Sequence, residues 1–171
     1  QIIGGAYPDF TYSFGFNLNY KRWGLSVFFQ GVQGRKVWVN YWSPTHHPFN
    51  AGTSPTVKWR DAWTPENPTN ELPAMFVSGW KGVSAYSNSD FFLMDASYLR
   101  LKNVMISYSF PDILINRIRL KELTLFVSGE NLLTFTKFEG SDPERHLSHQ
   151  SDVYSHFPQV RIINFGLNVK F

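Results

Sequence analysis

The stretch V-R-I-I-N-F-G-L-N-V-K-F (160–171) sets the fold class of this chain. From Phe165 to Phe171, aromatic and aliphatic residues alternate with glycine, asparagine and lysine, which is the two-residue period of a β-strand. One face of such a strand is apolar and the other is polar. The strand therefore needs an apolar environment on one side only.

A stronger copy of this pattern lies at 11–20, where tyrosines stand at both ends of the apolar face. About 9 to 11 residues suffice for a tilted strand to cross a bilayer. Tyrosine suits both ends because its hydroxyl can lie among headgroups while its ring stays in the apolar layer. The short link Lys21-Arg22 leads to a second alternating segment at 23–30, so we expect a hairpin.

Three further segments have the same period, at 98–110, 118–136 and 160–171, and the second strand is expected to continue through 35–42. Pro111 should end the third strand because it lacks a backbone donor. The sequence thus predicts an all-β chain with about five antiparallel strands.

The connections between the predicted strands alternate in length. They are short at 21–22 and 111–117, and long at 43–97 and 137–159. Outer-membrane barrels have this asymmetry, with tight periplasmic turns and long extracellular loops. Five strands cannot close a barrel, and an open edge in hydrocarbon leaves backbone groups unpaired. Either several copies of the chain assemble one barrel, or the remaining strands lie on another chain or fragment, and the odd strand count favours the second alternative.

Composition agrees with a barrel segment. The aromatic share is 18%, and a lipid-facing barrel needs aromatic girdles. No apolar run approaches the roughly 20 residues of a membrane-spanning helix. The sequence opens at Gln1 without the charged segment or apolar core of a signal peptide, so we expect either a mature product or, as the favoured alternative, a piece of a longer protein. The net charge of +3 is spread along the chain, and nucleic-acid binding is not expected.

Five motifs follow one another in order, and together they resemble the C-terminal part of the SusC/RagA-type TonB-dependent outer-membrane transporters. They are W-R-D-A-W-T-P-E-N-P (59–68), S-D-F-F-L-M-D-A-S-Y-L-R-L-K-N-V (89–104), S-G-E-N-L-L-T-F-T (128–136), D-P-E (142–144) and F-G-L-N-V-K-F (165–171). The resemblance spans nearly all of 1–171 and implies a large transmembrane β-barrel of about 22 strands around a plug. It implies that 1–171 is the C-terminal part of this barrel and contains no plug domain.

The resemblance also implies partners and a function. The expected activity is import of a glycan or oligosaccharide, or of a peptide, across the outer membrane of a Gram-negative bacterium, driven by TonB. The expected partners are the rest of the barrel and its plug, a SusD-like capping lipoprotein, TonB through the missing plug part, and outer-membrane lipid. A dimer of transporter–lipoprotein pairs is expected.

The tryptophans of the long segments are the candidate contacts for substrate or partner. Their indole rings could stack on sugars or peptide side chains at the barrel mouth, or contact the lipoprotein, or pack inside the loops, and the sequence leaves these readings open. The candidates are Trp38, Trp42, Trp59, Trp63 and Trp80.

The remaining polar and charged residues give weaker indications of a functional site. Three histidines and three acids in the second long segment could ligate a metal, but loop spacing does not fix them together, so a solvated loop is expected; they are His146, His149, His156, Asp142, Glu144 and Asp152. Arg100 and Lys102 fall on the same side as Val104 in a regular strand and would then sit in the headgroup zone or above it. No metal, cofactor or enzymatic activity is expected, because nucleophile-elbow and phosphate-loop patterns are missing from the sequence.

The alternative reading is a soluble all-β carbohydrate-binding module whose aromatic residues form its core and its ligand platform. Extraction discriminates the two, because only the barrel segment should require detergent.

Overall fold

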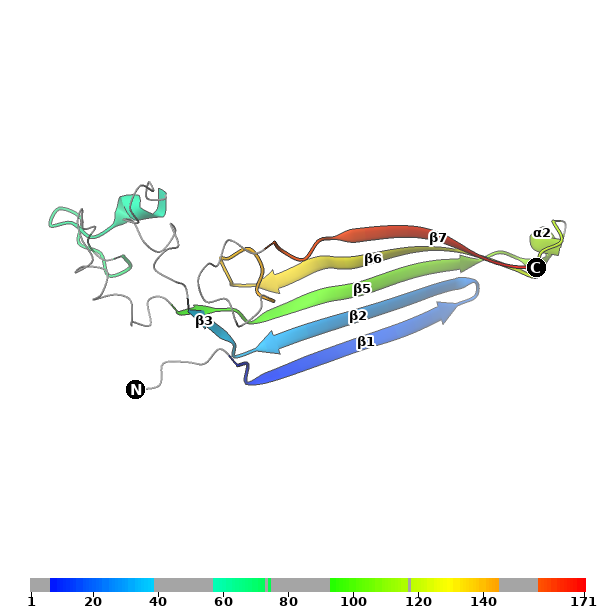
Figure 1. Ribbon diagram of the computed structural model, residues 1–171, viewed down its shortest axis with the longest axis horizontal. Coiled ribbons are helices and arrows are strands. Elements are labelled where there is room, and N and C mark those ends of the chain that lie inside the picture. Colours follow the sequence, from blue (N-terminus) through cyan, green and yellow to red (C-terminus); the bar gives the residue numbers. More distant parts are fainter. Residues whose placement is uncertain (1–6, 39–56, 73, 75–92, 117, 145–156) are drawn as a thin grey trace. The chain divides into compact units, whose positions relative to one another are not determined.

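The computed structural model describes residues 7–38, 57–72, 74, 93–116, 118–144 and 157–171, and these are almost entirely β-structure and loops (Figure 1). The chain divides into two compact units. The sheet unit comprises residues 8–34, 97–137 and 159–171, and the loop unit is drawn from the remaining segments.

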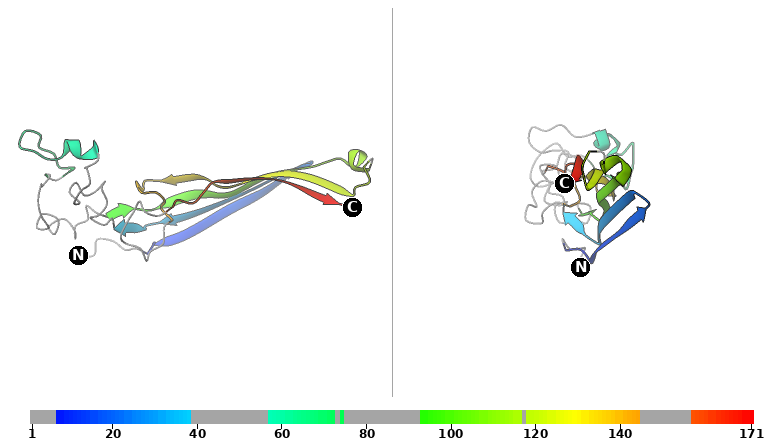
Figure 2. Two further views of the ribbon diagram at one scale, coloured as in Figure 1. Left: turned by 45° about the horizontal axis from the view of Figure 1, so that its top comes forward. Right: turned by 90° about the vertical axis from the view of Figure 1, so that its right-hand side faces the viewer.

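The sheet unit is one antiparallel sheet of five strands in the order β1-β2-β5-β6-β7, which Figure 2 shows from two further sides. The strands are β1 (Phe10–Tyr20), β2 (Trp23–Gln33), β5 (Tyr98–Ser109), β6 (Glu122–Thr136) and β7 (Ile162–Lys170). Sequential strands of the sheet are neighbours, and β1 and β7 form its two edges. The prediction of five antiparallel strands is confirmed.

The predicted hairpin at 11–30 is present. Tyr20 lies directly opposite Trp23, so the turn consists of Lys21 and Arg22 alone. Lys21 has a φ of 56° and therefore adopts the left-handed conformation. Phe14 and Phe29 are direct partners whose rings stack with centroids 4.9 Å apart, and this pair helps to fix the register.

The prediction that the second strand continues through 35–42 is wrong over its described part. β2 ends at Gln33, and Gly34 follows with a φ of 76°, a conformation that favours glycine. A Cβ at Gly34 would collide with the carboxylate of Asp9. After this break, β3 (Lys36–Trp38) pairs with β4 (Leu93–Asp95) in a separate two-stranded sheet. β4 lies inside a segment predicted to be loop; residues 39–42 lie outside the described ranges.

A β-bulge changes the faces of β5. Leu101 pairs with Phe29 of β2 whereas Asn103 pairs with Phe28, so Lys102 is an extra residue in the strand. The alternation therefore reverses at Lys102, and Arg100 lies opposite Gln30, on the face that Val104 does not share. The expectation that Arg100 shares a face with Val104 is wrong for this reason.

The bulge also involves β6. Leu133 pairs with Leu101 and Glu130 with Asn103, which leaves two residues of β6 facing one residue of β5. The first of these, Asn131, has a φ of 53° and donates a hydrogen bond from Nδ2 to the carbonyl oxygen of Val160 at 3.2 Å. The S-G-E-N-L-L-T-F-T motif thus contains the bulge and a contact to the segment that leads into β7.

The short connection predicted at 111–117 is a single helical turn, α2 (Asp112–Asn116). The carbonyl oxygen of Pro111 accepts hydrogen bonds from the amides of Leu114 and Ile115, and Ile115 is buried. The amide of Leu120 then bonds to the carbonyl of Ile115, so the chain is still turning there and β6 begins at Glu122 instead of the predicted 118.

The loop unit has two small cores within its described residues. Val37, Ala96 and Phe138 form one, with Met94 packed against it. The second core is built around η1 (Val57–Asp61), a 3-10 helix. In the described part of the chain, no helix has both the length and the hydropathy to span a membrane.

Candidate functional site: the two faces of the sheet

One face of the five-stranded sheet is apolar along every strand. The register aligns Phe16, Val27 and Val104 in one row across β1, β2 and β5. The same face continues over β6 and β7 through Leu125, Val127, Ile163, Phe165, Leu167 and Val169. Most of these side chains are exposed, and Phe165 is 77% exposed. Soluble proteins rarely expose a contiguous apolar surface of more than a few hundred Å², so this face suits an apolar solvent.

Aromatic rings cross the apolar face at the end of the sheet where the 21–22 turn lies, which we call the turn end. Tyr20 lies opposite Trp23, the rings of Trp23 and Tyr108 are 4.8 Å apart, and those of Tyr108 and Phe110 are 5.3 Å apart. Tyr12 lies on the same face near the other end of β1, where its ring occupies the space beside Gly31. Amphipathic rings at both ends of an apolar band are the arrangement of a barrel's aromatic girdles.

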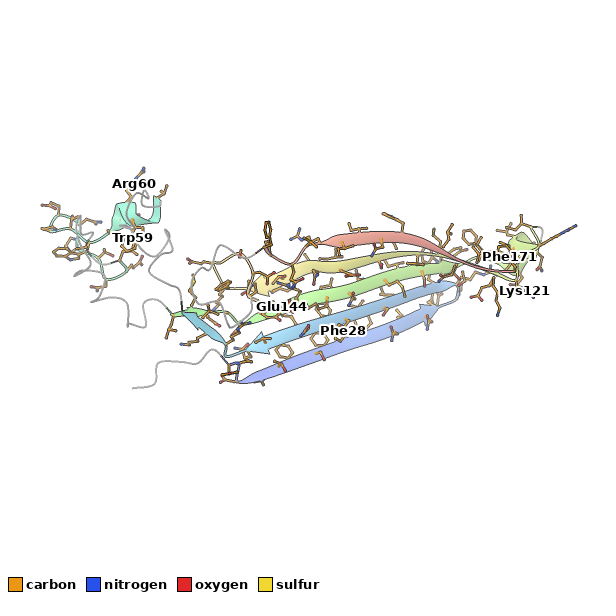
Figure 3. The ribbon with its side chains drawn as sticks, viewed as in Figure 1. Phe28, Trp59, Arg60, Lys121, Glu144 and Phe171 are labelled. Atoms are coloured by element: carbon orange, nitrogen blue, oxygen red, sulfur yellow. The ribbon has the colours of Figure 1, made fainter. Side chains whose placement is uncertain are left out.

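The opposite face of the sheet is mainly polar. It carries serine, threonine and asparagine side chains, and Ser109 Oγ lies 3.1 Å from Thr124 Oγ1 across β5 and β6. Phe28, labelled in Figure 3, and Phe126 interrupt this polar surface. A face of this composition can border water or a polar protein surface, which is the requirement of a barrel lumen.

Arg100 lies on this polar face and is buried to 2% exposure. Its guanidinium carbon is 5.5 Å from the ring centroid of Tyr98, which is buried as well, so the cation contacts an aromatic π-system. The bulge at Lys102 therefore keeps this charge away from the apolar face.

Of the three candidate tryptophans that the structure describes, Trp59 and Trp63 lie in one local loop. Trp59 is 2% exposed and packs with Ala62 and Leu72, whereas Trp63 is 41% exposed (Figure 3 labels Trp59). Trp38 lies on β3 opposite Leu93. Trp42 and Trp80 lie outside the described residues.

Local hydrogen bonds account for the motif around these two tryptophans. The amide of Trp63 donates to the carbonyl oxygen of Leu72 at 3.2 Å, which closes the loop over Trp59. Within it, Thr64 and Asn67 exchange two backbone hydrogen bonds, and Thr64 Oγ1 accepts a further one from the Asn67 amide at 3.0 Å. The burial of Trp59 indicates that its ring packs inside the loop, whereas Trp63 keeps a surface that a substrate or partner can reach.

The D-P-E motif is part of a second local arrangement. Arg35 donates from Nη1 to the carbonyl oxygen of Pro143 at 3.0 Å, and both residues are buried. Asp142 Oδ1 accepts a hydrogen bond from the amide of Glu144 at 2.8 Å. Arg35 could not be predicted as part of this arrangement, because its contact to Pro143 joins segments that are far apart in the sequence.

Two of the six candidate metal ligands lie among the residues that the structure describes. Asp142 and Glu144 belong to the turn just described, whereas His146, His149, Asp152 and His156 lie outside the described residues. Among the described residues, no group of three or more His, Asp, Glu or Cys side chains could hold a metal ion.

The chain is 34% identical over 181 residues to TonB-dependent receptor P3 of Formosa agariphila, with all of the chain and 17% of that protein covered. It is 32% identical over 179 residues to TonB-dependent receptor P26 of the same organism, with 99% of the chain and 18% of that protein covered. The chain thus spans less than a fifth of these relatives. No family model matches the sequence.

Solved structures share the fold of this chain. The chain superposes on the RagAB peptide importer in its open-open state with a TM-score of 0.76 and 23% identity, and in its closed-closed state with a TM-score of 0.77 and 22% identity. All of the chain and 18% of the solved chain are covered in each case.

Proposed function

We propose that this chain, which is a segment of a SusC/RagA-type TonB-dependent receptor, contributes five membrane-crossing strands to the barrel of an outer-membrane transporter. The observation that carries the proposal is the exposed apolar face, which the register makes continuous over all five strands. The aromatic row at the turn end then lies at the level of lipid headgroups.

The alternative, a soluble carbohydrate-binding module, requires that this face be covered by a second layer of the same domain. Instead, Phe16, Leu18 and Leu167 are each more than half exposed. Burying an apolar side chain is worth about 1.5–3 kcal/mol, so a soluble domain would gain strongly by covering them. The barrel reading needs no such cover, because lipid is the solvent of that face.

The proposal assigns residues 1–171 to the C-terminal part of the barrel, without a plug domain. The edges β1 and β7 present backbone groups that require partners in a membrane. The remaining strands of the receptor supply these partners, and the polar face with Arg100 and Asn17 borders the lumen and the plug.

The whole transporter is proposed to import an oligomeric nutrient, a glycan or a peptide, with TonB as energy source and a SusD-like lipoprotein as cap. The resemblance of the fold to the RagAB peptide importer supports a peptide as one substrate class. The exposed indole of Trp63 is a candidate contact for a sugar, a peptide or the lipoprotein.

Uptake by cells tests this function. A strain that lacks the full receptor should fail to grow on the cognate oligosaccharide or peptide as its sole source, and the receptor gene should restore growth only when TonB is present. Accumulation of labelled substrate should stop when a protonophore collapses the energy supply. TonB-independent uptake through the receptor would overturn the proposal.

A further inference from the structure

Two connections of the sheet unit meet at the turn end: residues 21–22 between β1 and β2, and the described residues 111–116 and 118–121 between β5 and β6. The amide of Ser109 donates to the carbonyl oxygen of Arg22 at 2.9 Å, and the amide of Lys121 donates to that of Lys170 at 2.8 Å. The first bond ties the 21–22 turn to the end of β5, and the second ties the β5–β6 connection to the end of β7. Figure 3 shows Lys121 and Phe171 at the same end of the sheet.

The turn end is cationic. Lys21, Arg22, Arg119 and Lys121 are all exposed to solvent. Between 111 and 121 the sequence has a single acid, Asp112, and Glu122 lies opposite Lys170 in the register. Positive charge therefore exceeds negative charge at this end of the sheet.

Apolar side chains stand among these cations. Ile113 is 75% exposed, Ile118 is 60% exposed and Leu114 is 50% exposed, whereas Ile115 is buried beneath them. A turn that faces only water gains nothing from three exposed aliphatic side chains. The turn end is also continuous with the row of Tyr20 and Trp23 at the end of the apolar face.

We propose that the turn end binds the headgroups of anionic phospholipids. The four cations attract the headgroup phosphates, and Ile113, Leu114 and Ile118 enter the boundary between headgroups and acyl chains. Apolar anchors combined with Lys and Arg are the features that hold protein segments at an anionic lipid surface. This inference rests on the proposed membrane position of the sheet, since the apolar face fixes the depth of the turn end.

Photocrosslinking in the full-length receptor tests the inference. The receptor is reconstituted in bilayers that contain a phosphatidylglycerol with a photoreactive headgroup, or a phosphatidylcholine with the same group, and labelled peptides are mapped by mass spectrometry. Phosphatidylglycerol should label peptides from 111–121 more strongly than phosphatidylcholine. Since each cation near an anionic surface favours binding by about fivefold, replacing all four (K21Q, R22Q, R119Q, K121Q) should lower this labelling about tenfold or more.

The matched control replaces cations at the opposite end of the same sheet, Lys137→Gln with Arg161→Gln, which should leave the labelling of 111–121 unchanged. Excess inorganic phosphate should not compete, because the site requires the acyl boundary as well as the phosphate; full competition would assign the cations to free phosphate and overturn the lipid proposal. Replacing Ile113 and Ile118 by serine should reduce labelling while the cations remain.

Equal labelling by the two lipids, or unchanged labelling in the fourfold variant, would overturn the inference. A phospholipid with a photoreactive acyl chain separates this failure from failure of the proposed function. If the acyl probe labels Phe165 and Leu167 but the headgroup probe shows no preference at 111–121, only the headgroup site is wrong. If the acyl probe does not label the apolar face, the membrane assignment is wrong too.

Discussion

Phe126 of β6 covers Gly166, its direct partner on β7, and the aromatic ring occupies the space in which a side chain at 166 would begin. Both residues lie on the polar face of the sheet, close to the edge formed by β7. An aromatic ring over a glycine of the neighbouring strand shields the backbone and helps to fix the register.

Enlarging Gly166 should therefore destabilise the β6–β7 pairing. Gly166→Val should cost about 1–3 kcal/mol because the ring of Phe126 must leave its position. The measurement is the thermal midpoint of the folded receptor, read from the gel mobility of unheated and heated samples. In the background of Phe126→Ala the same substitution should cost less, and equal costs in both backgrounds would show that the contact is unimportant.

The bulge at Lys102 leads to a second prediction. Deleting Lys102 forces regular alternation on β5, which turns Arg100 toward the apolar face or shifts the register. The expected cost is about 1–3 kcal/mol, between the values for a charge at the bilayer midplane and near its surface. Assembly yield in the outer membrane measures this effect.

Lys102→Ala is the control for the deletion, since it keeps the extra residue and removes only the side chain. It should change assembly little, as surface substitutions usually stay within about 0.5 kcal/mol. If the substitution and the deletion were equally harmful, the side chain of Lys102 would matter more than the bulge.

Substitutions at two adjacent residues in the middle of β2 compare the cost of placing a charge on each face of the sheet. Val27 lies in the central row of the apolar face, and Ser26 lies on the polar face. Val27→Arg should cost about 2–4 kcal/mol because it places a charge in hydrocarbon, whereas Ser26→Arg should be better tolerated. The folded fraction of receptor in isolated outer membranes reports both, and the reverse order would contradict the assignment of faces.

Trp59 and Trp63 should differ in how much they contribute to the local stability of the loop unit. Trp59→Ala removes a buried ring and should cost about 3–5 kcal/mol of local stability, so limited proteolysis should cut residues 57–72 faster. Trp63→Ala should change the proteolysis rate much less than Trp59→Ala, because 41% of the surface of Trp63 is already exposed. If Trp63 contacts substrate or lipoprotein, its replacement should weaken uptake or co-purification while proteolysis stays normal.

The strands could be predicted because alternation is a local property of the sequence. In β1, Phe14 and Phe16 alternate with Gly15 and Asn17, and the structure has the strand where that pattern indicates. The ends of the strands are harder to predict from alternation. Gly34 ends β2 through its backbone conformation and its close approach to Asp9, and neither feature is contained in the apolar pattern.

The apolar pattern of β5 contains a signal for the bulge. Leu99 and Leu101 occupy odd positions whereas Val104 and Ile106 occupy even ones, so the apolar phase changes across Lys102. Contacts between segments far apart in the sequence are harder to predict from the residue pattern. The pairing of β3 with β4 and the bond from Arg35 to Pro143 join segments far apart in the sequence, and residue pattern alone could not place them together.

The central claim is that alternate residues of these strands face lipid. It is tested most directly by single cysteines at Phe14, Phe16 and Leu18, and at Ser13, Asn17 and Asn19, in a cysteine-free full-length receptor. The segment itself contains no cysteine, so its background is already clean. Assembled receptor is treated in membranes with a lipid-soluble or a water-soluble maleimide, and labelling is read by mass. We expect the first three positions to react with the lipid-soluble reagent and to resist the water-soluble one, and the last three positions to show the opposite preference. Uniform reactivity with the water-soluble reagent along β1 would contradict it.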